Sequence, residues 1–272
     1  MKRLLPVAVA AMAAFSLGPF LWSALTSLKP ADELFRVPPT WIPRSVSLDN
    51  YRDVFAQRPF ARYMVNSLFV AGLSTILTLA AGAPAAWALA RLRLRWSAAI
   101  EKGFLAFALF PPAVLLVPLF VAARDAGVLN SRIGVAFVHA ALNLPFAVWS
   151  LTSFFRAFPA DLEDAARVDG FSRAGVLLRV VFPVSAPALA ATAILVFIFS
   201  WNEFVIALTF LTRDELRTVP VGVAMLSGVT AYDIPWGQIS AAVVVTTLPV
   251  VAAVLAFQRS IVQGLGAGAV KG

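Results

Sequence analysis

Long windows without formal charge dominate the hydropathy pattern of this chain. A helix that crosses about 30 Å of hydrocarbon at 1.5 Å per residue needs roughly 20 apolar residues. The windows that meet this length are residues 4–28, 63–90, 103–123, 133–155, 181–212 and 236–258. Their apolar runs are continuous rather than alternating, and lipid cannot satisfy the open backbone groups of isolated strands. The sequence therefore predicts an all-α polytopic membrane protein, with six spans in a single domain over residues 1–272.

The first window could also be read as a cleavable signal peptide, because Met1-Lys2-Arg3 precedes its apolar run. The apolar core of a signal peptide is usually about 7–15 residues long. The run here continues through Trp22 to Leu28. We therefore interpret it as a retained first span.

Composition supports lipid as the solvent of this protein. Hydrophobic residues make up 60% of the chain and charged residues 13%, with a mean hydropathy of +0.85. A soluble domain carries about 25% charged and 45–50% apolar residues. Cysteine is absent, so the sequence offers no disulfide and no thiol-ligated metal. The net charge of +8 could suggest a nucleic-acid partner, but the basic residues lie in short breaks between the apolar windows. That placement suits anionic lipid headgroups instead.

Six spans place both termini on one side of the membrane. If that side is cytoplasmic, the inner segments hold 12 of the 22 Lys and Arg residues. The bias is small overall but is concentrated in a short loop, where the positive-inside rule applies best. Arg91, Arg93, Arg95 and Lys102 fall within twelve residues there. We expect a bacterial cytoplasmic (inner) membrane protein with both termini in the cytoplasm.

Proline is frequent inside the windows. Each proline removes a backbone donor and frees a carbonyl, so bent or broken helices are expected, although proline is also simply commoner in membrane helices. The residues concerned are Pro84, Pro111, Pro112, Pro118, Pro145, Pro183, Pro187 and Pro249.

The polar segment 156–179 has the signals of a short helix with defined ends. Pro159 suits its first turn, the acidic residues that follow suit the positive end of the helix dipole, and Gly170 suits a left-handed stop. Ser172 can cap the next helix. One narrow face of the short helix is predicted to carry mainly small side chains that another protein could approach closely. That face consists of Leu162, Ala165, Ala166 and Asp169.

This segment resembles the EAA loop of binding-protein-dependent ABC importer permeases. The family pattern is E-A-A-x3-G-x9-I-x-L-P, and the chain has Asp164-Ala165-Ala166, three residues, Gly170, nine residues and then Val180-Val181-Phe182-Pro183. Asp replaces Glu, Val replaces Ile and Phe replaces Leu, so the reach of Asp164 toward a partner is shorter by one methylene. Three further stretches resemble the carbohydrate branch, of the maltose, trehalose or glycerol-phosphate type: Asn50-Tyr51, Trp201-Asn202-Glu203-Phe204 and the C-terminal residues 264–272.

The resemblance implies a subunit that couples to ATP hydrolysis without performing it. In that family the EAA helix docks on a separate cytoplasmic ATPase, and the expected partners are a second permease, two ABC ATPases, an extracytoplasmic solute-binding protein and a sugar. ATP and Mg²⁺ are expected in the ATPase, since this chain has no G-x-x-x-x-G-K-[ST] phosphate-binding loop. The predicted coupling residues are Leu162, Glu163, Asp164, Ala165, Ala166, Arg167, Asp169, Gly170 and Pro183. No cofactor, metal or catalytic residue is expected in the chain itself.

Glu203 is the only formal charge inside the six windows. An acidic residue at mid-bilayer is costly and should face protein or water. Two interpretations remain open for Trp201, Asn202 and Glu203: a substrate pathway or gate, or a polar clamp between helices. His139, the single histidine, is expected to make an inter-helix hydrogen bond, because no second His and no Cys could complete a metal site.

Two other classes of function compete with an ATP-driven permease. A secondary transporter generally needs several intramembrane ionisable residues for ion coupling, and this chain has few. An intramembrane enzyme needs a catalytic cluster, and none is evident. The segments 29–62 and 213–233, expected outside, are the candidates for contacting a solute-binding protein.

Overall fold

The structure is a computed structural model that describes residues 4–92, 94–226 and 234–269. Helices connected by loops make up this part of the chain, and it contains no strand. The first half comprises α1 (Leu4–Ser27), α2 (Ala31–Leu34), α3 (Asp49–Gln57), α4 (Phe60–Arg91), α5 (Ser97–Ala108), α6 (Pro112–Asp125) and α7 (Arg132–Ala157). The second half comprises α8 (Ala160–Val168), α9 (Arg173–Val176), the π-helical η1 (Leu177–Val181), α10 (Phe182–Val184), α11 (Ala186–Asn202), α12 (Val205–Phe210), the 3₁₀ turn η2 (Asp214–Leu216), α13 (Val219–Ala224) and α14 (Trp236–Ala269).

Within the described residues, four helices are long and apolar enough to cross a membrane: α1, α4, α7 and α14. Two bent pairs raise this number to six if each pair forms one span. The first pair is α5 with α6, bent by 93°, and the second is the α9–α10 segment with α11, bent by 79°.

The bent pairs lie where the sequence predicted the third and fifth spans. The window 103–123 is interrupted between α5 and α6, where Pro111 and Pro112 supply no backbone N–H. The window 181–212 is interrupted twice, so it is not one straight helix. The first break is at Ser185, close to Pro183 and Pro187, and the second is at Glu203 and Phe204. By contrast, α4, α7 and α14 continue through their internal prolines.

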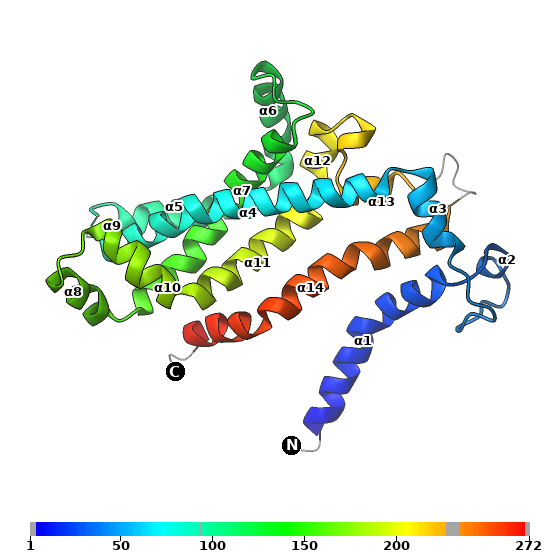
Figure 1. Ribbon diagram of the computed structural model, residues 1–272, viewed down its shortest axis with the longest axis horizontal. Coiled ribbons are helices and arrows are strands. Elements are labelled where there is room, and N and C mark those ends of the chain that lie inside the picture. Colours follow the sequence, from blue (N-terminus) through cyan, green and yellow to red (C-terminus); the bar gives the residue numbers. More distant parts are fainter. Residues whose placement is uncertain (1–3, 93, 227–233, 270–272) are drawn as a thin grey trace.

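The centre of the molecule is the pair α4 and α7. Helix α11 packs on α4, α7 and α14, and α1 packs on α14 (Figure 1). Small residues allow α4 and α7 to approach closely, since a Cβ atom placed on Gly82 would lie 3.4 Å from the Cβ of Ala147. Close backbone approach of this kind stabilises helix pairs in lipid, where van der Waals packing replaces the hydrophobic effect.

The molecule is elongated, and its two ends carry different elements (Figure 1). Helix α8 lies at one end, whereas α2 and α3 lie at the other. Helix α14 begins beside α3 and runs back toward the α8 end. The α8 end and the α2–α3 end are therefore opposite ends of the helix bundle.

Candidate functional site

The short helix α8 has the ends that the sequence predicted. It begins after Pro159, and its first turn contains Asp161 and Glu163. Gly170 follows it with φ of 84°, a left-handed conformation that glycine adopts without strain. Its N–H bonds to the carbonyl of Arg167 at 3.0 Å, and the next N–H, of Phe171, bonds to the carbonyl of Ala166 at 3.1 Å. These two bonds form a Schellman motif that satisfies the last carbonyls of α8.

The segment after Gly170 leads directly into the α9–α10 unit. The hydroxyl of Ser172 accepts a hydrogen bond from the N–H of Gly175 at 3.2 Å, which caps α9 as predicted. The chain then widens into the π-helical turn η1 before Pro183. Pro183 itself is exposed.

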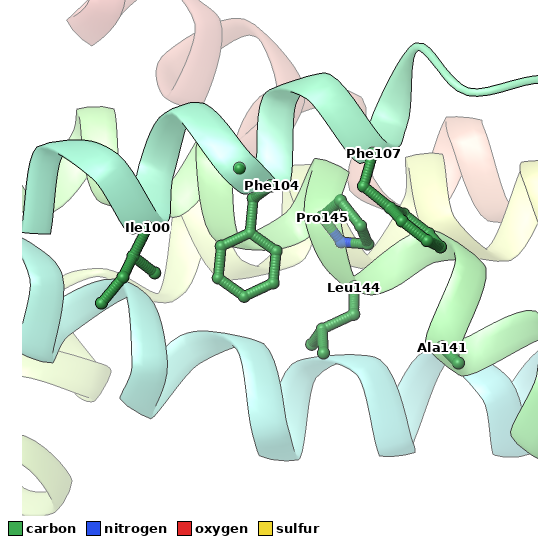
Figure 2. Close-up of a pocket in the computed structure, with 7 residues that line it drawn as sticks. Ile100, Phe104, Phe107, Ala141, Leu144 and Pro145 are labelled. Carbon is green, nitrogen blue, oxygen red and sulfur yellow. The ribbon is translucent and has the colours of Figure 1, made fainter. Parts of the chain in front are cut away.

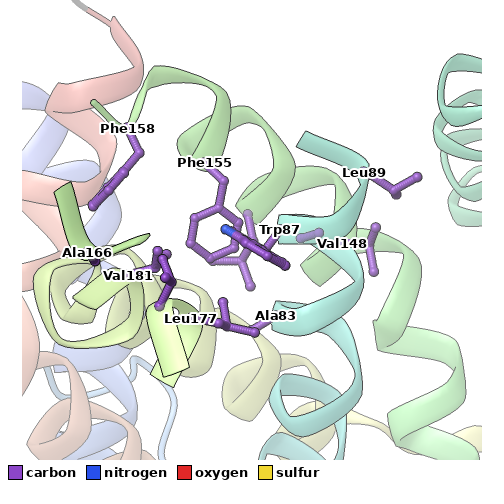
Figure 3. Close-up of a cluster of buried hydrophobic side chains, with 12 residues drawn as sticks. Ala83, Trp87, Leu89, Val148, Phe155, Phe158, Ala166, Leu177 and Val181 are labelled. Carbon is purple, nitrogen blue, oxygen red and sulfur yellow. The ribbon is translucent and has the colours of Figure 1, made fainter. Parts of the chain in front are cut away.

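One face of α8 is fixed to the rest of the molecule. Glu163 is 2% exposed, and its Oε1 lies 2.6 Å from Nε of Arg91, the last residue of α4. The same guanidinium donates to the carbonyl of Phe158. Ala166, one turn after Glu163, is buried in a cluster of aromatic and aliphatic side chains (Figure 3). Helix α8 is therefore joined to the C-terminal ends of α4 and α7 by a charge pair and by packing.

The other face of α8 is open. Leu162, Asp164, Ala165, Arg167 and Asp169 are all exposed. The face predicted for docking is thus only partly free, because Ala166 belongs to the packed side. Val168 is 88% exposed and extends the open surface, although the sequence pattern did not single it out. Glu163 was predicted among the coupling residues, but its side chain points into the protein and holds the helix in place.

The three neighbours Trp201, Asn202 and Glu203 do not form one site. Trp201 is 3% exposed and stacks on Phe197, with ring centroids 5.7 Å apart. It belongs to the core near α3 and the start of α4. Asn202 is exposed, and its side chain donates to the carbonyl of Ile198 at 2.9 Å. Consecutive residues near the end of a helix point in directions about 100° apart, which separates their surroundings.

Glu203 lies just before helix α12. Its carboxylate accepts hydrogen bonds from the N–H groups of Ile206 and Ala207 at 2.8 Å and 3.0 Å, which are first-turn donors of α12. It also lies 3.0 Å from Nε2 of His139 on α7. The inter-helix hydrogen bond expected of His139 is confirmed. Glu203 therefore acts structurally as a clamp and cap at the break between α11 and α12.

A cavity of about 450 Å³ lies beside this clamp, between the start of α6, α7 and the α11–α12 break. His139, Asn143, Ser200 and Glu203 supply its polar groups. The amide of Asn143 donates to the hydroxyl of Ser200 at 3.1 Å, and this hydroxyl donates to Ser74 of α4 at 2.8 Å. The sequence did not point to either serine, because no local pattern distinguishes them from other small residues in a span.

A second hollow is lined by residues without polar side chains. It lies between α5 and α7, where Ile100, Phe104 and Phe107 lie opposite Leu144 and Pro145 (Figure 2). Such a surface offers no hydrogen bond to a hydroxylated ligand. No group of three His, Asp or Glu side chains in the described part of the chain could hold a metal ion.

Comparison with known proteins identifies the class to which these features belong. Residues 79–266 match the family model of the binding-protein-dependent transport system inner membrane component. The chain belongs to this family. The matched region includes α8, Gly170 and the cavity beside Glu203. The chain is thus an integral inner-membrane transport subunit and not an enzyme, and ATP hydrolysis belongs to a separate ATPase.

Several known members of this family align with nearly the whole length of the chain. The sulfoquinovosyl glycerol transport system permease of Agrobacterium fabrum is 41% identical over 271 residues, covering 100% of this chain and 94% of the relative. The trehalose/maltose permease of Thermococcus litoralis is 39% identical, covering 100% and 98%, and the trehalose permease of Mycobacterium tuberculosis is 37% identical, covering 95% and 93%.

The fold also matches a solved transporter. A crystal structure of a bacterial ABC transporter involved in importing the acidic polysaccharide alginate has a chain that superposes with a TM-score of 0.81 over 95% of both chains. At 21% sequence identity this likeness concerns the fold alone.

Proposed function

We propose that this protein forms half of the translocation pathway of an ATP-driven importer of di- or oligosaccharides. In this proposal it pairs with a second permease, two ABC ATPases drive the pair, and a solute-binding protein delivers the sugar. The relatives that carry trehalose, maltose and sulfoquinovosyl glycerol in their names support a glycoside substrate.

The observation that carries the coupling role is the attachment of α8. A helix that receives force from an ATPase must be rigidly joined to the spans that move. Glu163 and Ala166 supply that joint, and the open face with Leu162, Ala165 and Asp169 is free for a partner. Asp164 and Arg167, which pair at 3.3 Å on the surface, would set the register of docking.

The cavity beside Glu203 is the proposed contribution of this chain to the sugar pathway. Asn143 and Glu203 can bond hydroxyl groups, and Phe199 in the same lining can pack on a sugar ring. The sequence suggested Trp201, Asn202 and Glu203 for the substrate pathway. We assign only Glu203 to it, since the other two residues do not line the cavity.

Topology supports the remaining assignments. The segment 91–102 is rich in basic residues, and its first residue, Arg91, pairs with Glu163 of α8. By the positive-inside rule this supports a cytoplasmic position for α8 and for both termini. The opposite segments 29–62 and 213–233 would then face the solute-binding protein; residues 227–233 of the second segment lie outside the described residues.

An ion-coupled secondary transporter is not favoured. The family is one of binding-protein-dependent systems. The one intramembrane carboxylate, Glu203, is engaged in capping α12 and binding His139.

The test is ATP-dependent sugar uptake by the reconstituted complex in proteoliposomes. Uptake should require the permease pair, the ATPases, the binding protein and ATP together. Uptake driven by a proton or sodium gradient without ATP would overturn the proposal. A cysteine placed at Val168 should react with a membrane-impermeant thiol reagent only from the cytoplasmic side.

A further inference from the structure

A second polar pocket lies at the end of the bundle opposite α8. It has a volume of about 290 Å³ and is enclosed by the last turns of α1, the segment with α2, and the first turns of α14. Lys29 and Glu33 line it together with Trp22, Trp236 and Ser240. Neither the coupling helix nor the cavity beside Glu203 is part of it.

Two opposite charges are buried in this pocket. Lys29 is 4% exposed and Glu33 is 3% exposed. Lys29 donates to the carbonyl of Thr40 at 2.5 Å, and Glu33 accepts from the hydroxyl of Thr40 and from the N–H of Arg44 at 3.1 Å. An ammonium has three donors and a carboxylate about four acceptor sites, so both groups retain hydrogen-bonding capacity.

Two residues with hydroxyl groups also line the pocket. Thr26 lines it from α1, but its Oγ1 is buried within the protein and has no hydrogen-bond partner among the described residues. Ser240 contributes a hydroxyl group from α14.

The pocket lies at the expected depth of lipid headgroups. Trp22 is close to the end of α1, Trp236 starts α14, and Trp41 contacts the ring of Trp22 edge-on at 5.3 Å. Tryptophan gathers at membrane–water interfaces. None of the apolar window of α1 is buried inside the protein, so this chain does not cover the apolar surface beside the pocket.

We infer that this pocket binds the headgroup of a zwitterionic phospholipid with a primary amine. The phosphate would accept hydrogen bonds from Lys29 and Ser240, and the ammonium group would donate to Glu33. A purely anionic headgroup would meet the carboxylate of Glu33, and a choline headgroup has no N–H to donate to it. The acyl chains would extend along α1. This inference is independent of the transport role proposed above.

The test is native mass spectrometry of the purified transporter complex, titrated with phosphatidylethanolamine, phosphatidylglycerol and phosphatidylcholine of identical acyl chains. Phosphatidylethanolamine should bind about tenfold more tightly than phosphatidylcholine, because one charge-assisted hydrogen bond contributes about that much to affinity. Equal retention of the three lipids, or stronger retention of phosphatidylglycerol, would overturn the inference. Displacement of the lipid by trehalose or maltose would identify the pocket as a sugar site and overturn it as well.

Two variants locate the bound lipid. Glu33→Gln should abolish the preference for the amine headgroup, and Ser240→Ala, which removes the hydroxyl group contributed by α14, should weaken binding of all three lipids. Asp32→Asn and Arg36→Gln are the controls, because both change exposed charges of the same segment. Since Glu33→Gln could also loosen the segment, the deciding variant is Ser240→Ala: wild-type lipid retention in this variant contradicts the assignment.

Discussion

The carboxylate of Glu163 on α8 lies 2.6 Å from the guanidinium of Arg91 at the end of α4, and both side chains are largely shielded from solvent. The two residues are 72 positions apart in the sequence. Their pairing joins the exposed helix α8 to one of the two helices at the centre of the bundle. A displacement of α8 must therefore move α4 or break a buried charge pair.

Breaking this pair should destabilise the protein and uncouple transport. Removal of one partner from a buried ion pair typically costs about 3–5 kcal/mol because the other charge stays unpaired. We expect Arg91→Met to lower the melting temperature of the complex and to reduce the sugar transported per ATP hydrolysed. Both quantities can be measured on the reconstituted transporter.

Arg167→Met is the matched control, since it removes an arginine whose pairing with Asp164 is on the surface. Surface pairs contribute about 0–1 kcal/mol, so its melting temperature should stay near that of the wild type. The double variant Arg91→Met, Glu163→Leu should recover part of the lost stability. An Arg91→Met protein with wild-type stability and coupling would contradict the anchoring role.

Gly170 should tolerate only residues that accept a left-handed backbone. A Cβ atom there would meet nothing within 4 Å, so the cost of Gly170→Val is conformational, about 1–2 kcal/mol. We expect this variant to lose coupled uptake, and Gly170→Asn to retain more of it. Gly127→Val introduces comparable strain at φ of 68° in the turn before α7, also without a clash. If both valine variants impaired coupling equally, general strain and not α8 would explain the loss.

Trp201 should affect stability and not sugar affinity. Truncating a buried aromatic residue costs about 3–5 kcal/mol, so Trp201→Ala should lower the melting temperature strongly. Trp201→Phe should remain folded with an unchanged KM for sugar uptake. A KM that rises severalfold in Trp201→Phe at wild-type stability would place this residue in the pathway after all.

Glu203 should contribute both to folding and to transport. Glu203→Ala removes the cap of α12, which costs about 0.5–2 kcal/mol, and leaves His139 without its partner. Glu203→Gln keeps an oxygen acceptor for the first turn of α12, so it should fold while raising the KM for sugar. Asn202→Ala, outside the cavity, is the control. Wild-type uptake kinetics in Glu203→Gln would exclude the carboxylate from the sugar pathway.

Glu33 should make the α2 end of the molecule sensitive to acid. The hydrogen bond from Thr40, together with the N–H of Arg44 and the charges of Lys29 and Arg44, lowers the pKa of the Glu33 carboxyl below its usual value. A carboxyl with a lowered pKa in the folded state stabilises the protein above its unfolded pKa, about 4.3. That stability disappears as the pH falls through the lower folded pKa. Melting temperatures measured from pH 7 to pH 3 should therefore fall less steeply for Glu33→Gln than for the wild type, with exposed Asp32→Asn as control.

Local patterns explain the features that the sequence predicted well. The ends of α8 depend on residues within one or two turns, and so Pro159, Gly170 and Ser172 could be assigned in advance. The breaks near Ser185 and Glu203 were harder to foresee. A long apolar window indicates that a segment lies in the membrane, but it does not show where the helix bends. Proline is no guide either, because α4 and α7 continue through their prolines whereas other prolines lie at sharp bends.

The sequence alone determined that the chain is helical and lies in a membrane, and it identified the loop around Gly170, because length, hydropathy and spacing are properties of neighbouring residues. Only the tertiary structure decided that Glu163 faces inward to Arg91 and that Trp201 and Glu203 belong to different surroundings. It alone brought Lys29 and Ser240 to one pocket. These relationships depend on how each helix is rotated and on contacts between distant segments, and no local pattern encodes either.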